Sequence, residues 1–432
     1  LRLCDRIKNI YLLATEKIPG EVEGCSILMV DSFASTATYR TIALHADTAY
    51  TLLYTKSTVF EPGQFAFERL LAIAGDTNAG MLYADRYQVE GGNRKLAPVI
   101  DYQKGSLRDD FDFGSLLFFR SSVLKQAVRA MDADYRFAGL YDLRLRVSEL
   151  SELVHVNEYL YSEVETDTRK SGEKLFDYVD PKNRAVQIEM ESVCTAYLKR
   201  IGGYLAPGFE PISFDIDGFE QEASVIIPVR NRVRTIEDAI RSVLMQETTF
   251  RFNLIIVDNH STDGTSEAIE KYTADKRVIH LIPERFDLGI GGCWNVGVHH
   301  PACGKFAVQL DSDDVYSGPD TLQKIVNAFY EQNCAMVVGT YRMTDFKMNE
   351  IPPGIIDHRE WTPDNGRNNA LRINGLGAPR AFYTPVLRQI NLPNTSYGED
   401  YALGLRISRT WQIGRIYDVL YLCRRWEDNS DA

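Results

Sequence analysis

The chain has 432 residues, of which 44% are hydrophobic, and a formal net charge of −12 with a pI of about 5.2. This length suggests two domains, and the acidic charge excludes non-specific binding to nucleic acid, which requires dense lysine and arginine. No apolar run reaches the ~18–20 residues that span a bilayer, and the seven cysteines include no Cys-x-x-Cys pair, so we expect a cytoplasmic protein with reduced thiols.

Short apolar runs in the first half predict strands. One run covers residues 9–13 and another covers residues 50–54, and the second run ends in Thr55-Lys56-Ser57-Thr58. Further along, residues 204–222 contain two prolines and two glycines without sustained periodicity, which is the pattern of a linker. We therefore predict a domain boundary near residue 220, between domains 1–220 and 221–432.

The second half alternates strands and helices. Because ligands on a parallel sheet gather at the carboxyl ends of its strands, Pro228, Asp258 and Asp311 should converge on one crevice. The alternation predicts an α/β fold with a mostly parallel sheet. Apolar runs predict strands at residues 223–228, 252–258, 278–282 and 306–310, and helical spacing predicts helices at residues 235–245, 266–272 and 291–298.

The two halves repeat each other in sequence. Arg146-Val147-Ser148 aligns with Arg406-Ile407-Ser408, and residues 9–13 and 50–58 align with residues 253–257 and 305–314. Several such matches in the same order favour a duplicated domain. No residues precede Leu1 to match residues 225–231, so we expect either that the chain is a fragment or that the first copy lost its first strand.

Asp311 and Asp313 follow the last predicted buried strand. Residues i and i+2 of an extended backbone point the same way, so both carboxylates can face one ligand. Carboxylate oxygens, together with substrate phosphates, are the ligands that Mg²⁺ and Mn²⁺ prefer. A solvated acidic loop is the alternative for a lone Asp-x-Asp motif, and the α/β context favours a metal site.

Three further segments should reach the same crevice. Asp258 ends a strand, where its carboxylate can accept a hydrogen bond from a nucleobase. The glycine-rich residues 288–295 let the backbone approach a ligand. Glu399-Asp400 begin an amphipathic run, where acids either stabilise a helix N-terminus or provide a general base in Asp400.

In these motifs the second half resembles glycosyltransferase family 2, whose members have the nucleotide-sugar-binding GT-A fold. The resemblance implies an inverting enzyme that moves a sugar from a nucleotide-diphosphate donor to a hydroxyl acceptor, with Mn²⁺ or Mg²⁺, in glycan or polysaccharide biosynthesis. The motifs lie in family order across residues 223–426, at residues 225–231, 257–265, 295–297, 311–313 and 399–400.

The resemblance also implies a role for individual residues. Asp400, with Glu399 beside it, would deprotonate the acceptor hydroxyl. Asp313, with Asp311, would hold the metal against the diphosphate. The residues implied for binding the nucleotide sugar are Pro228, Arg230, Asn231, Asp258, Gly291, Asn295, Asp311 and Ser312.

The sequence departs from the family pattern at two places. Arg230 stands where family members often have an aromatic residue. No histidine follows the last strand, where many members place one near the metal, and Arg424 or Arg425 could face the diphosphate instead.

The first half resembles the same fold after decay. Thr55 and Ser57 stand in place of the two aspartates, and hydroxyls are poor Mg²⁺ ligands. Gly139-Leu140 replace the acidic pair, and the nearby Asp142 and Asp85 are displaced from it. We predict that this half performs no metal-dependent transfer, and that it presents an acceptor-binding or dimerising surface or only supports its partner domain.

Two other classes of function stay open. A non-catalytic carbohydrate- or nucleotide-sugar-binding protein has no need for three aspartates together. A sugar nucleotidyltransferase needs a Gly-rich, Lys-bearing loop where this chain has Pro228-Val-Arg-Asn-Arg232. Expected partners are a nucleotide-diphosphate sugar, with uridine diphosphate as the family's common nucleotide, and a glycan or lipid-linked acceptor. Peripheral association with the inner face of the membrane and a homodimer also stay open.

Overall fold

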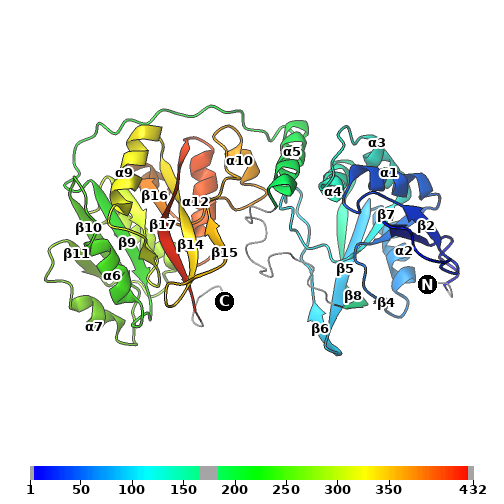
Figure 1. The fold of residues 1–432 in the computed structure, drawn as a ribbon, viewed down its shortest axis with the longest axis horizontal. Coiled ribbons are helices and arrows are strands. Elements are labelled where there is room, and N and C mark those ends of the chain that lie inside the picture. The colour runs from blue at the N-terminus through cyan, green and yellow to red at the C-terminus, as the bar shows by residue number, and fades with distance from the viewer. Residues whose placement is uncertain (1–3, 165–182, 427–432) are drawn as a thin grey trace. The chain divides into compact units, whose positions relative to one another are not determined.

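The computed structural model describes residues 4–164 and 183–426, and these divide into two compact units (Figure 1). The first unit ends at Tyr204 and the second begins at Leu205. Among the residues that the structure describes, no helix has both the length and the apolar character that crossing a bilayer requires.

The boundary between the units lies upstream of the one predicted near residue 220, because residues 205–222 pack on the second unit. Tyr383 donates its hydroxyl to the carbonyl of Ser213 at 3.0 Å. Glu210 donates its backbone N–H to the carbonyl of Thr410 at 2.9 Å. The ring of Phe214 lies between 5.1 and 6.4 Å, centroid to centroid, from the rings of Phe306, Phe329, Tyr330 and Tyr383. The burial of apolar surface around Phe214 attaches residues 205–222 to the second unit, although the sequence indicates only a linker there.

The second unit contains one nine-stranded sheet. Its strands are β9 (Ala223–Val229), β10 (Phe252–Asp258), β11 (Val278–Leu281), β12 (Phe306–Gln309), β13 (Val315–Tyr316), β14 (Met336–Asp345), β15 (Glu350–Ile356), β16 (Arg380–Tyr383) and β17 (Ile413–Arg425). The order is β11-β10-β9-β12-β16-β14-β17-β13, with β15 paired to β14. The first four strands are parallel, as predicted, and β16 is antiparallel to both of its neighbours.

Two groups of helices pack on this sheet and bury its strands. The helices are α6 (Ile236–Leu244), α7 (Thr265–Glu270), α8 (Ile290–His299), α9 (Thr321–Gln332), α10 (Gly366–Asn369), α11 (Thr384–Ile390) and α12 (Glu399–Ser408). α8 contacts β9, β10, α11 and α12, whereas α6 contacts β10, β13 and α7, and α9 contacts β14 and β17. Every residue of β10 and β12 is buried, which explains why these strands are continuous apolar runs in the sequence.

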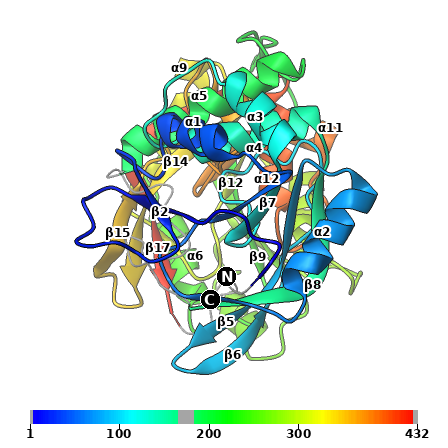
Figure 2. The ribbon, with the colours of Figure 1, turned by 90° about the vertical axis from the view of Figure 1, so that its right-hand side faces the viewer.

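The first unit contains a six-stranded sheet and a separate parallel pair of strands. Its strands are β1 (Tyr11–Ala14), β2 (Ser26–Met29), β3 (Tyr50–Tyr54), β4 (Phe60–Pro62), β5 (Met81–Glu90), β6 (Asn93–Ala97), β7 (Leu116–Arg120) and β8 (Leu153–Val164). Its helices are α1 (Thr36–His45), α2 (Ala66–Thr77), α3 (Ser121–Arg129), α4 (Gly139–Leu150) and α5 (Arg184–Arg200). Helices α1, α3 and α4 pack against one another (Figure 2).

The six-stranded sheet has the strand order of the matching part of the second unit. The order β3-β7-β5-β8-β4, with β6 on β5, parallels β12-β16-β14-β17-β13, with β15 on β14. Each neighbouring pair is also parallel or antiparallel in the same sense in both units. The pair β1-β2 occupies the chain position of β10-β11, and within residues 4–164 and 183–204 no strand corresponds to β9.

Candidate active site

A pocket of about 540 Å³ lies at the carboxyl ends of β9, β10 and β12 in the second unit. Strand register explains the location, since Pro228 pairs with Val257 and Gln309 pairs with Ile226, so the loops that follow these strands meet. Seven of the residues implied by the sequence line this pocket: Pro228, Arg230, Asp311, Ser312, Asp313, Glu399 and Asp400.

Asp258 does not line the pocket, because it is fully buried beneath the loop that follows β10. Its carboxylate accepts hydrogen bonds from the backbone of Ser261 at 3.0 Å, from the Ser266 hydroxyl, and from His280 Nε2 at 3.4 Å. Burial disfavours the charged form, but hydrogen bonds from His280, Ser266 and Ser261 outweigh it and hold the pKa of Asp258 well below its usual range. Asp258 therefore orders the loop and does not face the pocket.

Asn231, the second predicted binding residue outside the pocket lining, joins two loops. Its backbone N–H donates to the Ser261 hydroxyl at 2.9 Å, and its side-chain oxygen accepts from the Thr262 N–H at 2.8 Å. Its φ of 54° places it in the left-handed region, which asparagine tolerates. The residue shapes the loop that carries Arg230.

Gly291 and Asn295, on α8, hold the loop that leads to the acidic pair. Asn295 donates to the carbonyl of Leu392 at 2.8 Å and accepts from its N–H at 2.9 Å. The N–H of Gly291 donates to the carbonyl of Thr395 at 3.0 Å, and a Cβ at Gly291 would collide with the carbonyl of Pro393. Glycine is needed here for close approach of two chain segments, whereas the sequence indicated contact with a ligand.

Asp311 and Asp314 differ from Asp313 in their surroundings. Tyr421 donates its hydroxyl to Asp311 Oδ2 at 3.0 Å, and Gln309 donates to Oδ1 at 2.9 Å. Burial, together with the charge of Asp313, raises the pKa of both Asp311 and Asp314. Asp314 accepts from the backbone of Arg424 at 2.8 Å and is buried. Asp311 and Asp313 thus keep part of their surface exposed, whereas Asp314 does not.

The donor set fits a divalent cation that is completed by a substrate. Within residues 4–164 and 183–426, no three His, Cys, Asp or Glu side chains converge on a metal position. Asp313 and Asp311 offer carboxylate oxygens at the pocket wall, and Mg²⁺ is usually bound through one or two carboxylates plus phosphate oxygens and water. These two residues could therefore hold Mg²⁺ or Mn²⁺ when a diphosphate is present.

The two arginines that end β17 have different roles. Arg424 is buried and donates to Asp238 Oδ2 at 2.9 Å and to the carbonyl of Asp313, so it fixes the Asp313 loop. Arg425 lines the pocket, together with Arg232, whose Nε lies 3.8 Å from Asp313 Oδ2. Of the two alternatives, Arg425 is the one that faces the pocket.

The acidic pair, which also lines the pocket, begins α12. Asp400 Oδ2 lies 2.5 Å from Arg380 NH2, and Asp400 Oδ1 accepts from the Tyr401 N–H at 2.6 Å. Glu399 is buried, and burial followed by the charge of Asp400 raises its pKa. Arg380, Gln309 and Tyr421 contact the acidic residues, yet sequence reasoning missed all three. Gln309 precedes Asp311 by two residues and so shares its face of the strand, which was the one available signal.

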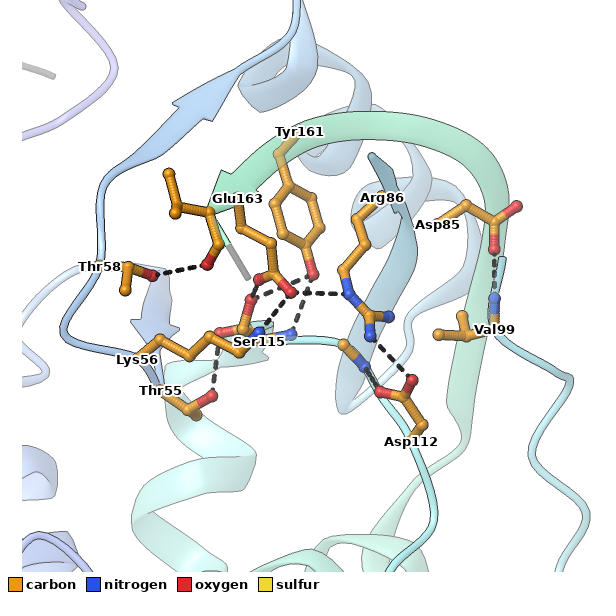
Figure 3. A network of polar contacts seen from close by, with 12 residues as sticks. Thr55, Lys56, Thr58, Asp85, Arg86, Val99, Asp112, Ser115, Tyr161 and Glu163 are labelled. Carbon is orange, nitrogen blue, oxygen red and sulfur yellow. Dashed lines mark hydrogen bonds and ion pairs between the residues drawn. The ribbon is translucent and has the colours of Figure 1, made fainter. Parts of the chain in front are cut away.

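The corresponding edge of the first unit is occupied by its own side chains (Figure 3). Glu163, whose side chain has no exposed surface, lies 2.6 Å from Lys56 Nζ and 2.8 Å from Arg86 Nε. The Ser115 hydroxyl also donates to Glu163, and Thr55 Oγ1 donates to the carbonyl of Ser115 at 3.3 Å. The ammonium of Lys56 thus balances this carboxylate internally.

Asp85 and Asp142, the displaced acids of the first unit, have structural partners. Asp85 accepts from the backbone of Val99 at 2.9 Å and lies 2.9 Å from His155 Nε2. Asp142 lies 2.9 Å from Arg146 Nε, and burial raises its pKa. Neither replaces the acidic pair of α12.

Comparison with known proteins places the second unit among sugar transferases. The model of "Glycosyl transferase family 2" matches residues 224–389. An uncharacterized glycosyltransferase of Rickettsia felis is 31% identical over 200 residues, which cover 46% of this chain and 32% of that protein. TuaG of Bacillus subtilis, provisionally named as a teichuronic acid biosynthesis glycosyltransferase, is 33% identical over 185 residues, which cover 43% of this chain and 71% of TuaG.

A solved structure shows a weaker likeness. Residues 1–349 of S. aureus TarS, crystallised with UDP-GlcNAc, align at 22% identity and a TM-score of 0.40, over 48% of this chain and 60% of that one. The matched part of this chain spans about a third of the length of the Rickettsia felis relative (32%).

Proposed function

The chain belongs to glycosyl transferase family 2, and on this premise we propose that its second unit, which has the GT-A fold, is an inverting glycosyltransferase. The substrate pair is a nucleotide-diphosphate sugar and a hydroxyl acceptor. The observation that carries the proposal is the convergence of Asp311, Asp313 and Asp400 on one pocket, with four arginines in the same lining: Arg230, Arg232, Arg380 and Arg425.

The proposed reaction assigns one task to each wall of the pocket. Asp400 takes the proton of the acceptor hydroxyl while the acceptor oxygen forms a bond to the anomeric carbon and the bond from that carbon to the diphosphate breaks. Attack opposite the leaving group inverts the anomeric centre. Arg232 and Arg425, in the same lining, would neutralise the charge that the departing diphosphate gains. Asp313 and Asp311 would hold Mg²⁺ or Mn²⁺, which would supply further neutralisation as a Lewis acid.

The names of the relatives support a narrower proposal for the substrates. TuaG is named for teichuronic acid biosynthesis, and TarS was crystallised with UDP-GlcNAc. We extend the proposal to a uridine-diphosphate sugar as donor and to a hydroxyl of a cell-envelope polysaccharide, free or lipid-linked, as acceptor. A lipid-linked acceptor would bring the chain to the cytoplasmic face of the membrane, which flotation with acceptor-loaded vesicles would measure.

Transfer assays with a panel of nucleotide sugars test the proposal. We expect turnover that requires Mn²⁺ or Mg²⁺ and stops with a chelator, and losses of at least about 100-fold for Asp313→Ala and Asp400→Asn. Asp275→Asn, at a half-buried ion pair with Arg277 away from the pocket lining, is the matched control and should keep the wild-type rate. Unchanged rates in both pocket variants would show that the mechanism is wrong.

We also propose that the first unit is a degenerate copy of the same fold, without the metal motif, and that it transfers no sugar. The shared strand order and the internal Lys56–Glu163 pair support this reading. In the full chain, the double variant Asp311→Asn with Asp313→Ala should lose all Mn²⁺-dependent binding of uridine diphosphate by calorimetry. Binding that survives would belong to the first unit and contradict its assignment. Sedimentation of the same preparation would decide whether the chain is a homodimer.

A further inference from the structure

A continuous chain of polar contacts links Asp311 to Asp400 in the lining of the pocket. Gln309 donates from Nε2 to Asp311 Oδ1 at 2.9 Å, and its Oε1 accepts from Arg380 NH1 at 3.0 Å. Arg380 NH2 then lies 2.5 Å from Asp400 Oδ2. All four side chains line the pocket, and neither Gln309 nor Arg380 belongs to the sequence motifs.

Arg380 is held firmly enough to orient another group. It is the first residue of β16, which pairs with β12 on one side and β14 on the other, so its backbone is fixed within the sheet. Its side chain is 12% exposed, and Nε donates to the carbonyl of Leu376 at 2.5 Å. Nε, NH1 and NH2 of one planar group therefore each have a different acceptor, and the rigid fork leaves one orientation for the guanidinium.

Three carboxyl groups surround Arg380, so the orientation of its guanidinium affects the position of Asp400. Asp400 and Glu399 lie at the start of α12, Asp311 follows β12, and Arg380 is in electrostatic contact with Glu399 and Asp311 as well as paired with Asp400. An ionised carboxylate has about four acceptor positions, of which the contacts to Arg380 and to the Tyr401 N–H occupy two on Asp400. The remaining positions stay open for an acceptor hydroxyl.

We infer that Arg380 is a positioning residue for transfer: it fixes the Asp400 carboxylate, and Gln309 ties that arrangement to the donor-side Asp311. The inference rests on the proposed function, in which Asp400 is the base. The position of the Asp400 carboxylate therefore depends on Arg380. In the proposed mechanism Arg380 contacts neither the diphosphate nor the acceptor oxygen.

Steady-state kinetics of the full chain separate positioning from binding. For Arg380→Gln we expect kcat to fall about 10- to 100-fold, because misplacement of a reacting group by about 1 Å costs this much, while the donor KM stays within about two-fold. Arg380→Lys keeps the charge without the fork and should recover only part of kcat. Arg380→Gly should regain activity when guanidine hydrochloride at millimolar concentration is added. Arg277→Gln, at a half-buried ion pair away from the pocket lining, is the control and should behave as wild type.

Crystal structures of the wild type, Arg380→Gln and Gln309→Leu decide the inference without any turnover. We expect the Asp400 carboxylate to leave its wild-type position in Arg380→Gln, and to shift less in Gln309→Leu, which retains the arginine. An unmoved carboxylate in Arg380→Gln, or equal losses in kcat and donor affinity, would overturn the inference. If the wild type transfers no sugar, the proposed function fails, and the crystal structures still show whether Arg380 positions Asp400.

Discussion

The Lys56 ammonium lies 2.6 Å from the Glu163 carboxylate in the first unit, beside the strand end where the second unit presents Asp311 and Asp313. The shared strand order of the two sheets makes these edges equivalent. A fixed internal cation in the first unit thus occupies the region where the second unit has the carboxylates that we propose as metal ligands.

The buried Glu163 should be important for the stability of the first unit. Glu163→Gln leaves Lys56 and Arg86 without their shared counter-charge, and breaking a buried ion pair from one side costs about 3–5 kcal/mol. Denaturant unfolding of the full chain should show a lower midpoint for the transition of this unit. Glu90→Gln, at the exposed pair with Lys95, should change stability by less than about 1 kcal/mol. Equal effects of the two substitutions would contradict the assigned role.

The Asp258–His280 pair predicts a pH dependence of stability. The hydrogen bond to Asp258 raises the pKa of His280, so its contribution is complete below the unfolded value of about 6.5 and is lost as pH rises through the folded value. The depressed pKa of Asp258 acts in the opposite direction, since its contribution is present above about pH 3.9 and is lost as pH falls through the folded value. Thermal unfolding of His280→Gln should lack the decline that the wild type shows above about pH 6.5.

Tyr421 does not line the pocket, but it should affect the affinity of the proposed metal site at Asp311 and Asp313. Tyr421→Phe removes the hydroxyl that donates to Asp311 Oδ2 at 3.0 Å and accepts from the Asp311 N–H at 3.1 Å. Loss of such a supporting hydrogen bond typically weakens metal binding about 10- to 100-fold, which calorimetry with Mn²⁺ and a nucleoside diphosphate would measure. Tyr417→Phe, at a side chain that is 47% exposed, is the control. Retention of full affinity in Tyr421→Phe would remove Tyr421 from the site.

Residues 205–222 should stabilise the second unit as part of its core. A fragment that begins at residue 205 should unfold at a higher temperature than one that begins at residue 221, because the second lacks Phe214 and its ring contacts. Phe214→Ala in the full chain should cost about 2–3 kcal/mol, somewhat less than truncation of a fully buried phenylalanine. Identical melting temperatures of the two fragments would return the boundary to residue 220.

The strands of the second unit are well predicted from the sequence, because strands that are buried on both faces appear as continuous apolar runs. The candidate carboxylates Asp258 and Asp311 lie at the ends of such runs. Local pattern also identifies Asp258, Gly291 and Asn295 as special, but it assigns them to a ligand, whereas their hydrogen bonds hold neighbouring loops. Arg380 could not be found in this way. Its contact with Gln309 depends on β16 entering the sheet beside β12, which is a property of strand order and not of any nearby residues.

The arginines of the pocket are local positive charges in an acidic molecule. Arg230, Arg232, Arg380 and Arg425 line the pocket of a chain whose net charge is −12, beside five carboxyl groups: Asp311, Asp313, Asp314, Glu399 and Asp400. An anion that diffuses toward the protein therefore meets long-range repulsion first and attraction only within about 8 Å at physiological ionic strength. Added salt screens both the long-range repulsion and the attraction by the arginines, so the association rate of an anionic ligand should depend less on ionic strength than the four arginines alone would suggest.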